Sequence, residues 1–367
     1  MKLTINRDEL LAPLQAINNV VERRQTLPIL GNVLVNAEDN GEITLTATDM
    51  EVEIVVKLQG TTEQAGTITV PARKFLDICR ALPGEAVVTF SIQEEKVKIQ
   101  SGRSRFLLAS QPSEEFPSIG SFEASAEIDL PSSTLSSLVE GTQFAMAHQD
   151  VRYYLNGLLF ELSAGMIRTV ATDGHRLALC DRSIETSELE ARQIIVPRKG
   201  VVEIMRMLGS PDDPMKITIG GNHLKMTTRN QSLTTKLVDG RFPDYERVIP
   251  RAGEKKVFAD RETLKAGLAR ASILSNEKFR GVRIVLSKDQ LKAIAHNPEQ
   301  EEAEEDIEVE YSGDELEIGF NVSYLLDVLS VLKCPKVRVD FIDSNSSCLI
   351  QDPDDEMARY VIMPMRL

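Results

Sequence analysis

An internal threefold repeat is the feature of this sequence that most constrains its fold, because each copy must form the same unit. Residues 70–82 align with residues 196–208, and in both copies a Val-Pro pair precedes apolar residues at helical spacing. A third copy over residues 320–332 keeps the apolar positions and the mid-helix acid in register. Each copy follows one β-like run and precedes another, so the pattern predicts a strand, helix, strand unit.

A second helix is predicted upstream in every repeat. Apolar residues over 10–21 share one helical face behind Asn6, which is placed to cap the helix. Residues 135–146 and 264–274 repeat this spacing, the latter behind Asp260 as the cap. Alternating, β-branched segments between the helices predict paired strands. We therefore expect an α+β fold in which each unit has two helices backed by antiparallel β-sheet.

The Phe-Pro pairs at 116–117 and 242–243 close the first two repeats. We predict domains over residues 1–122, 123–252 and 253–367, which suits a chain of 367 residues. Three units alone would form an arc, and a symmetric head-to-tail partner would close six units into a ring.

The charge balance decides little by itself. The chain has 42 Lys+Arg against 56 Asp+Glu, a net charge of −14 that would repel DNA if it were spread evenly. A ring with acidic residues outside and basic residues inside would avoid this repulsion. The sequence shows neither an apolar run of about 18 residues nor a secretion signal, so we expect a cytoplasmic protein. The four dispersed cysteines predict reduced packing residues, and we expect neither a metal site nor a cofactor.

Catalysis has little support in the sequence. Phosphate-binding loops, zinc-binding motifs and nucleophile elbows are missing from it, and its four histidines are dispersed. The best enzyme candidate is a hydrolase that uses Asp173 and His175, but Asp-Gly is first a turn signal and the counterpart at Asp49 has no histidine. A non-catalytic binding protein is favoured, and a protein-binding scaffold that does not bind DNA is the other alternative.

Opposite charges occur in the first and third repeats. A basic strand edge with an apolar centre contains Lys96, Lys98, Arg103, Arg105, Phe106 and Leu108. The third repeat has an acidic stretch over residues 299–310 near the helix end at Ile273 and Leu274. Acidic runs are usually solvated loops, but a matching basic edge favours an interface between two copies of the chain.

Two further surfaces stand out. Basic pairs recur at equivalent helix starts, at Arg73-Lys74 and Arg198-Lys199, which favours contacts with nucleic-acid phosphates that carry no sequence preference. Apolar residues around 155, 177, 243 and 361–365 predict a groove for partner proteins, with core packing as the alternative for Leu177 and Val361. An apolar chain end is expected to be docked, since free termini fray.

Six motifs together resemble the beta subunit of bacterial DNA polymerase III, the sliding clamp family. They are YYLNG at 153–157, ATDGHRL at 171–177, VPRKG at 196–200, DGRFPDY at 239–245, ILSNEKFRGV at 273–282 and MPMRL at 363–367. The resemblance implies a homodimeric ring of six similar domains that encircles double-stranded DNA. It further implies a processivity factor for the replicative polymerase in DNA replication, with a clamp loader and repair polymerases as other partners through short linear motifs.

The resemblance also implies site residues. The expected peptide pocket contains Leu155, Thr172, Gly174, His175, Arg176, Leu177, Pro243, Arg247, Val248, Tyr324, Ser347, Val361, Met363, Pro364, Met365 and Arg366. The expected DNA contacts are Arg24, Gln149, Tyr153 and Tyr154, in addition to Arg73, Arg198 and Lys199. The expected dimer contacts are Lys74, Lys96, Arg103, Arg105, Phe106, Leu108, Ile273, Leu274, Glu299, Glu301, Glu302 and Glu305. Asn345 departs from the apolar residue that we expect at the pocket rim, which predicts a more polar corner there.

Overall fold

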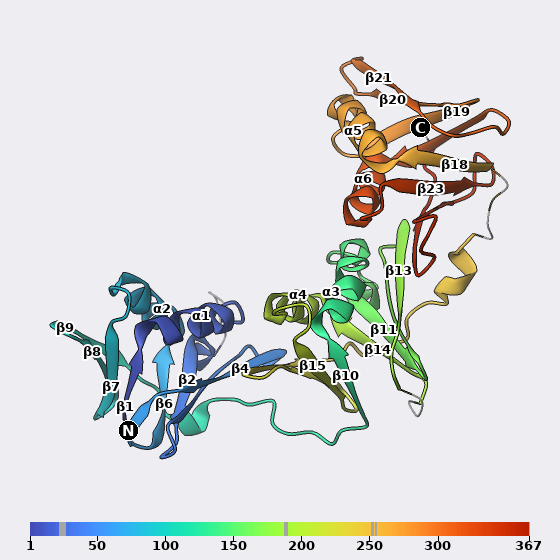
Figure 1. The fold of residues 1–367 in the computed structure, drawn as a ribbon. Helices are drawn as coiled ribbons and strands as arrows, with labels where there is room; N and C mark the ends of the chain where they lie inside the picture. Colours follow the sequence, from blue (N-terminus) through green and yellow to red (C-terminus); the bar gives the residue numbers. More distant parts are fainter. Residues whose placement is uncertain (22–26, 187–189, 251–252, 254, 367) are drawn as a thin grey trace. The chain divides into compact units, whose positions relative to one another are not determined.

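The computed structural model describes residues 1–21, 27–186, 190–250, 253 and 255–366 (Figure 1). It forms two compact units, the first of Met1–Ser133 with Lys199–Leu237 and the second of Thr134–Arg198 with Val238–Leu367. No helix in the described ranges is both long and apolar enough to cross a membrane. The free cysteines Cys79, Cys180 and Cys348 are buried, as expected of packing residues.

Among its described residues, the first unit contains two antiparallel sheets and three α-helices. The helices are α1 (Arg7–Asn18), α2 (Ala72–Ala81) and most of α4 (Arg198–Met207). A five-stranded sheet has the order β5 (Thr61–Gln64), β1 (Lys2–Asn6), β7 (Val87–Gln93), β8 (Lys96–Ser101) and β9 (Ser104–Ala109). An eight-stranded sheet has the order β10 (Ala126–Pro131), β15 (Pro214–Ile219), β16 (His223–Thr227), β17 (Gln231–Lys236), β4 (Val52–Gln59), β3 (Glu42–Thr48), β2 (Asn32–Ala37) and β6 (Gly66–Pro71).

The second unit repeats this plan. Its helices are most of α3 (Ser132–Glu140), α5 (Arg261–Ala271) and α6 (Val322–Val331). An eight-stranded sheet has the order β14 (Arg192–Pro197), β11 (Gly157–Ser163), β12 (Met166–Thr172), β13 (Arg176–Ser183), β25 (Ala358–Ile362), β24 (Cys348–Gln351), β23 (Lys336–Phe341) and β18 (Lys255–Asp260). A four-stranded sheet has the order β21 (Glu302–Glu308), β20 (Gln290–His296), β19 (Gly281–Ser287) and β22 (Leu316–Asn321).

The expected repeat is present in both units, and the predicted fold class is confirmed. Each repeat places one helix after its first strand and another before a later strand, and the helices pack their apolar faces on the sheets. Phe75 of α2 is fully buried and meets Phe90 of β7 edge-to-face, with ring centroids 4.8 Å apart. The predicted caps are also confirmed, since Asn6 accepts a hydrogen bond from the backbone of Asp8 and Asp260 accepts one from Thr263.

The predicted ends of the upstream helices were too late. The periodic apolar residues continue to 146 in the second repeat and to 274 in the third, but α3 ends at Glu140 and α5 at Ala271. Short 3₁₀ helices, η3 (Gln143–Ala145) and η6 (Ser272–Leu274), bury the remaining apolar residues in part. Such turns keep the chain compact after the α-helical hydrogen bonds have ended, so periodicity alone does not locate the helix end.

Candidate protein-binding and DNA-binding surfaces

A buried apolar cluster in the second unit contains three of the residues predicted for the peptide pocket. Leu155, Leu177 and Val361 are only 2%, 3% and 1% exposed and belong to one cluster with Phe242 and Tyr245. The core alternative for Leu177 and Val361 is therefore confirmed by their burial. These side chains belong to the close-packed core of the second unit, and this cluster is called the apolar floor below.

The end of the chain is docked, as expected. The backbone amide of Met363 donates to the carbonyl of His175 at 2.9 Å, and that of Met365 donates to Gly319 at 2.9 Å. Met363, Pro364 and Met365 are half-buried and Arg366 is exposed. Leu367 lies outside the described residues. The two backbone bonds tie this segment to His175, just before β13, and to Gly319 of β22.

A tight turn between β12 and β13 carries four of the predicted pocket residues. The Thr172 hydroxyl donates to the carbonyl of Arg176 at 2.6 Å and accepts from the amide of Gly174 at 3.1 Å. The Asp173 carboxylate accepts from the amides of His175 and Arg176 at 2.9 and 3.0 Å. Asp173 therefore holds the turn in shape while His175 stays exposed, an arrangement that gives no support to a hydrolytic pair.

Arg176 is the best-fixed charge at this surface. Its guanidinium bonds Asp173 at 3.1 Å, Asp327 at 2.5 Å and the carbonyl of Phe144 at 2.7 Å. It also lies over the ring of Tyr324, 4.5 Å from the centroid. Neither Asp327 nor Phe144 was predicted as a site residue from the sequence, although Asp327 is the mid-helix acid of the third repeat. A half-buried arginine needs such an acid, and this requirement is the signal that could have found it.

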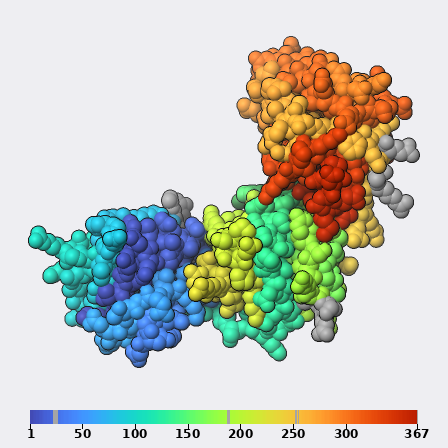
Figure 2. Space-filling view, in the orientation of Figure 1, coloured from blue at the N-terminus to red at the C-terminus, as the bar shows by residue number. Residues whose placement is uncertain are grey.

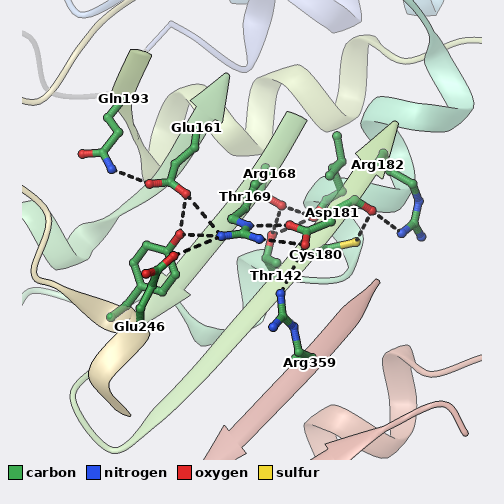
Figure 3. A network of polar contacts seen from close by, with 12 residues as sticks. Thr142, Glu161, Arg168, Thr169, Cys180, Asp181, Arg182, Gln193, Glu246 and Arg359 are labelled. Atoms are coloured by element: carbon green, nitrogen blue, oxygen red, sulfur yellow. Dashed lines mark hydrogen bonds and ion pairs between the residues drawn. The ribbon is translucent and has the colours of Figure 1, made fainter. Parts of the chain in front are cut away.

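A polar network holds the segment that carries Arg247 and Val248 (Figure 3). Arg168 donates two hydrogen bonds of 2.5 and 2.9 Å to the Asp181 carboxylate and a third, of 3.1 Å, to the hydroxyl of Tyr245. That hydroxyl donates in turn to Glu161. The hydrogen bonds to Asp181 raise the pKa of Arg168, and burial raises the pKa of Tyr245, so neither group titrates at neutral pH.

Tyr245 begins the 3₁₀ helix η5 (Tyr245–Val248), whose Arg247 and Val248 are exposed. Pro243, just before it, is exposed as well. The network therefore fixes a short exposed segment at the edge of the apolar floor. The sequence analysis did not find Arg168, because its acidic partners lie on other strands and no local motif marks them.

The remaining members of the predicted pocket differ in their exposure. Ser347 is half-buried just before β24, and Asn345 is exposed in a turn where its amide donates to Asp343 at 2.8 Å. A cavity of about 620 Å³ lies beside the chain end, but from the predicted set only Met365 and Arg366 line it. Its other walls include Phe279 and Arg283, which the sequence analysis did not assign to the pocket.

The residues predicted to contact DNA differ in their exposure to solvent. Arg73 is exposed on α2, Gln149 is exposed with a φ of +56°, and Tyr153 is 58% exposed. Tyr154 packs against the apolar cluster and meets Tyr153 edge-to-face with ring centroids 5.8 Å apart. Arg24 lies outside the described residues.

The second basic pair is already engaged by the fold. The guanidinium of Arg198 donates to the carbonyl of Met146 at 3.4 Å. The ammonium of Lys199 forms an ion pair with Asp49, which offsets its charge. Lys199 is thus less available to a phosphate than Arg73 is.

Each of the four sheets ends in two edge strands, and two of these, β9 in the first unit and β21 in the second, are called the two free edges below. The β8–β9 hairpin projects from its unit (Figures 1 and 2). Leu107 is 54% exposed and Phe106 and Leu108 are half-buried, so β9 is apolar on both faces. Arg103, Arg105, Lys96 and Lys74 are all exposed. An unpaired apolar edge is an association site unless something covers it.

The acidic edge is partly neutralised by its own unit. On β21, Glu302 lies 3.3 Å from His296, Glu304 pairs with Lys292, and Glu305 receives two hydrogen bonds of 2.9 and 2.7 Å from Arg270. Glu299 and Glu301 are exposed beside the strand. Ile273 in the nearby η6 is 74% exposed and Leu274 is half-buried. The predicted dimer residues thus gather at two edges, one in each unit.

Comparison with known proteins gives one consistent result. Models of the N-terminal, central and C-terminal domains of the DNA polymerase III beta subunit match residues 1–120, 129–244 and 246–366. A beta sliding clamp from Escherichia coli strain K12 is 52% identical over 368 residues, with 100% of both chains covered.

Solved structures agree. A sliding clamp from Pseudomonas aeruginosa bound to griselimycin is 50% identical, with a TM-score of 0.97 and 100% of both chains covered. The polymerase III beta structure from Caulobacter crescentus is 36% identical, with a TM-score of 0.94 and the same coverage.

Proposed function

The chain belongs to the DNA polymerase III beta subunit family, and from this premise we propose how its surfaces serve a sliding clamp. As in that family, it is a non-catalytic processivity factor that encircles duplex DNA as a homodimeric ring and tethers the replicative polymerase. We place it in the cytoplasm, where replication occurs in bacteria. We propose which residues close the ring, which face the DNA and which receive partner peptides. The strongest support comes from the equivalence of the two free edges to strands that pair inside the chain.

The two free edges are equivalent to edges that are paired inside the chain. In the first unit β17 pairs with β4, and in the second β25 pairs with β13, both antiparallel. By position within the repeat, β9 corresponds to β17 and β25, while β21 corresponds to β4 and β13. A third junction of the same kind would therefore join β9 of one protomer to β21 of its partner. Two such seams close a head-to-tail dimer.

The internal junctions also predict the register of the seam. Through the strand pairings, Phe106 corresponds to Leu233 and Tyr360, while Ala303 corresponds to Ile54 and Ala178. Leu233 faces Ile54 in one junction, and Tyr360 faces Ala178 in the other. Both junctions thus give the same answer, that Phe106 faces the partner's Ala303.

Burial supports this assignment. Leu233 and Tyr360 are 0% and 2% exposed in their junctions, whereas Phe106 at the equivalent place is half-buried. Tyr360 also packs against Phe144, the middle residue of η3, with ring centroids 6.0 Å apart. Ile273 is the middle residue of η6, so it occupies the corresponding position beside the seam. Its 74% exposure in the single chain is what an unformed seam would leave.

The register sets Arg105 opposite the partner's Glu304, which gives a test by charge exchange. Arg105→Glu should weaken the dimer by about 1 kcal/mol or less per seam, because both side chains are exposed and screened by salt. Adding Glu304→Arg should restore most of that loss, and adding Glu301→Arg, three residues out of register, should restore less. Dimer dissociation constants from sedimentation at low salt would measure this. Equal rescue by both second changes would show that the register is wrong.

We propose that DNA contacts are few and directed at phosphates, since a sliding protein must hold DNA loosely. Arg73, Gln149 and Tyr153 are exposed and suited to this role, the half-buried Tyr154 lies beside Tyr153, and Arg24 is a further proposed member. Contacts of these side chains with phosphates would be independent of the base sequence.

Replacing Gln149 and Tyr153 together with Ala should shorten retention on linear DNA by severalfold and slow loading, with no change in sequence preference. Val151, which lies between them and is 95% exposed, gives a matched control when it is changed to Ala. Retention is measured as the rate at which loaded clamps leave a linear duplex at several salt concentrations. A double variant with the retention of the parent would remove these residues from the DNA surface.

The peptide surface is proposed around the apolar floor of the second unit. The docked chain end supplies Met363 and Met365, η5 supplies Val248 and Arg247, and the β12–β13 turn supplies His175. A short extended peptide with a hydrogen-bonding side chain and paired hydrophobic residues suits this combination of apolar floor and polar rim. Two buried side chains would contribute about 3–6 kcal/mol before ordering costs, which suits exchangeable binding by several partners.

A further inference from the structure

We propose a second protein-binding pocket, in the first unit at the junction of β4 and β17, for a partner segment that presents one apolar side chain beside a carboxylate. The inference extends the proposed peptide surface of the second unit, because it rests on the equivalence of the two junctions. The cavity has a volume of about 200 Å³ and is lined by Thr48, Met50, Pro117, Ser118, Ile119, His223 and Lys236.

The lining corresponds position by position to residues proposed for the peptide surface. The strand registers match Thr48 with Thr172, since each lies opposite the first paired residue of the next strand. They likewise match His223 with Ser347 and Lys236 with Met363, because Leu224 corresponds to Cys348 and Thr235 to Ile362. The Phe-Pro pairs match Pro117 with Pro243.

The turn beside the cavity has the same construction as the turn at the peptide surface. The Thr48 hydroxyl donates to the carbonyl of Val52 at 3.0 Å and accepts from the amide of Met50 at 3.0 Å. Asp49 accepts from the amides of Glu51 and Val52 at 2.9 and 2.7 Å. Met50 has a φ of +73° where Gly174 has +89°, a conformation that methionine adopts only when its surroundings impose it. The strained turn presents a methionine, 43% exposed, at the mouth of the cavity.

This pocket has a positively charged side chain where its counterpart in the second unit has an apolar one. Lys236 is exposed at the place of Met363, and the structure records no ion pair for its ammonium among the described residues. Glu53, only 8% exposed and outside the lining, stands at the strand position of Leu177 and accepts from the amide of Ile119 at 3.0 Å. The pocket therefore keeps an apolar wall of Met50, Pro117 and Ile119 but gains a cation at its rim.

His223 supplies a second polar feature. Both of its ring nitrogens are buried and have no hydrogen-bond partner within the described ranges, while the ring stacks on Phe122 at 5.6 Å. Burial, followed by the charge of Lys236, lowers its pKa, so the ring is neutral at pH 7, with one donor and one acceptor nitrogen. A buried polar group without a partner is costly, and an incoming carboxylate or amide would satisfy it.

The volume of the cavity and the charge of its lining indicate which ligand it would bind. A cavity of about 150 Å³ admits a benzene ring, so this one holds a single large apolar side chain rather than a drug-sized molecule. Lys236 and His223 favour a carboxylate next to that side chain. An extended peptide of a partner protein with an acidic or C-terminal carboxylate beside leucine or phenylalanine meets both requirements.

The test uses the full chain labelled with ¹³C at its methionine methyl groups and N-acetyl-L-leucine as the probe. Met50 reports the second pocket, while Met363 and Met365 report the peptide surface of the second unit. The Met50 signal should shift in a saturable way, and N-acetyl-L-leucinamide, which has no carboxylate, should bind more weakly. Lys236→Gln should raise the dissociation constant at Met50 roughly three- to fivefold, the range of an exposed ion pair. Lys57→Gln, on the same sheet and outside the cavity lining, should leave it unchanged.

Each outcome bears on one proposal. If Met50 does not shift while Met363 and Met365 respond to a hydrophobic peptide, the second pocket is wrong and the peptide surface stands. If Met50 shifts and those two methionines do not, the peptide surface fails instead. Equal binding by parent and Lys236→Gln would overturn the carboxylate assignment. The unperturbed methyl spectrum of each variant establishes that it is folded.

Discussion

A chain that ends at Ile362 should lose partner-peptide binding by about a hundredfold or more and fail to stimulate the polymerase, yet remain a dimer. The truncation removes Met363 and Met365, and each buried methionine contributes about 1.5–3 kcal/mol to such a contact. The strand β25 ends at Ile362, so its pairing with β13 and β24 survives. Peptide titration and sedimentation of the same sample measure the two properties separately.

Met357→Ala is the matched control, since Met357 is half-buried just before β25 and lies outside the proposed surface. It should keep both the peptide affinity and the dimer. Retained peptide affinity in the truncated chain would move the site elsewhere. Loss of the dimer would mean that the chain end, rather than β9 and β21, closes the ring.

Replacing Phe106 and Leu108 together with Ser should convert the dimer to monomers at concentrations where the parent is closed. Burial of the two side chains contributes about 3–6 kcal/mol per seam, and both seams must break for the protomers to separate. High salt weakens the parent only in part, because the apolar contacts are not screened. Sedimentation velocity over a dilution series gives the dissociation constant, and the half-life of clamps on circular DNA reports ring opening.

Val87→Ser provides the control for this pair, because Val87 is a 56% exposed residue of β7, which is an inner strand of the same sheet. It should leave the dimer intact. A Phe106 and Leu108 double variant that sediments as a stable dimer would contradict the seam at β9, whatever its effect on replication.

The repeats and most of the helices could be predicted because their signals are local. Apolar residues at helical spacing, the caps at Asn6 and Asp260 and the alternating strands all occur within short windows of sequence. The periodicity failed at Glu140 and Ala271, where apolar residues continue through a 3₁₀ turn that has no spacing signal of its own. Helix ends depend on which backbone hydrogen bonds the next segment can replace.

Contacts between residues far apart in the sequence could not be predicted in the same way. Arg176 and Asp327 are 151 residues apart in the sequence, and Arg168 and Tyr245 are 77 residues apart, so no local pattern links either pair. The resemblance to the family marked Arg176 but not the acid that fixes it. The pocket at His223 and Lys236 needs three strand registers before its residues come together, and only coordinates supply those.

The two free edges differ from each other, which has a genetic consequence. If β9 pairs with β21 of the partner, as we propose, a subunit with a damaged β21 still offers an intact β9 to a normal partner. The mixed dimer closes one seam and leaves the other open. The normal copy is therefore part of a ring that cannot stay on DNA. Edge lesions should therefore be dominant over the wild-type allele, whereas lesions at the peptide surface leave the partner's own site working and should be recessive.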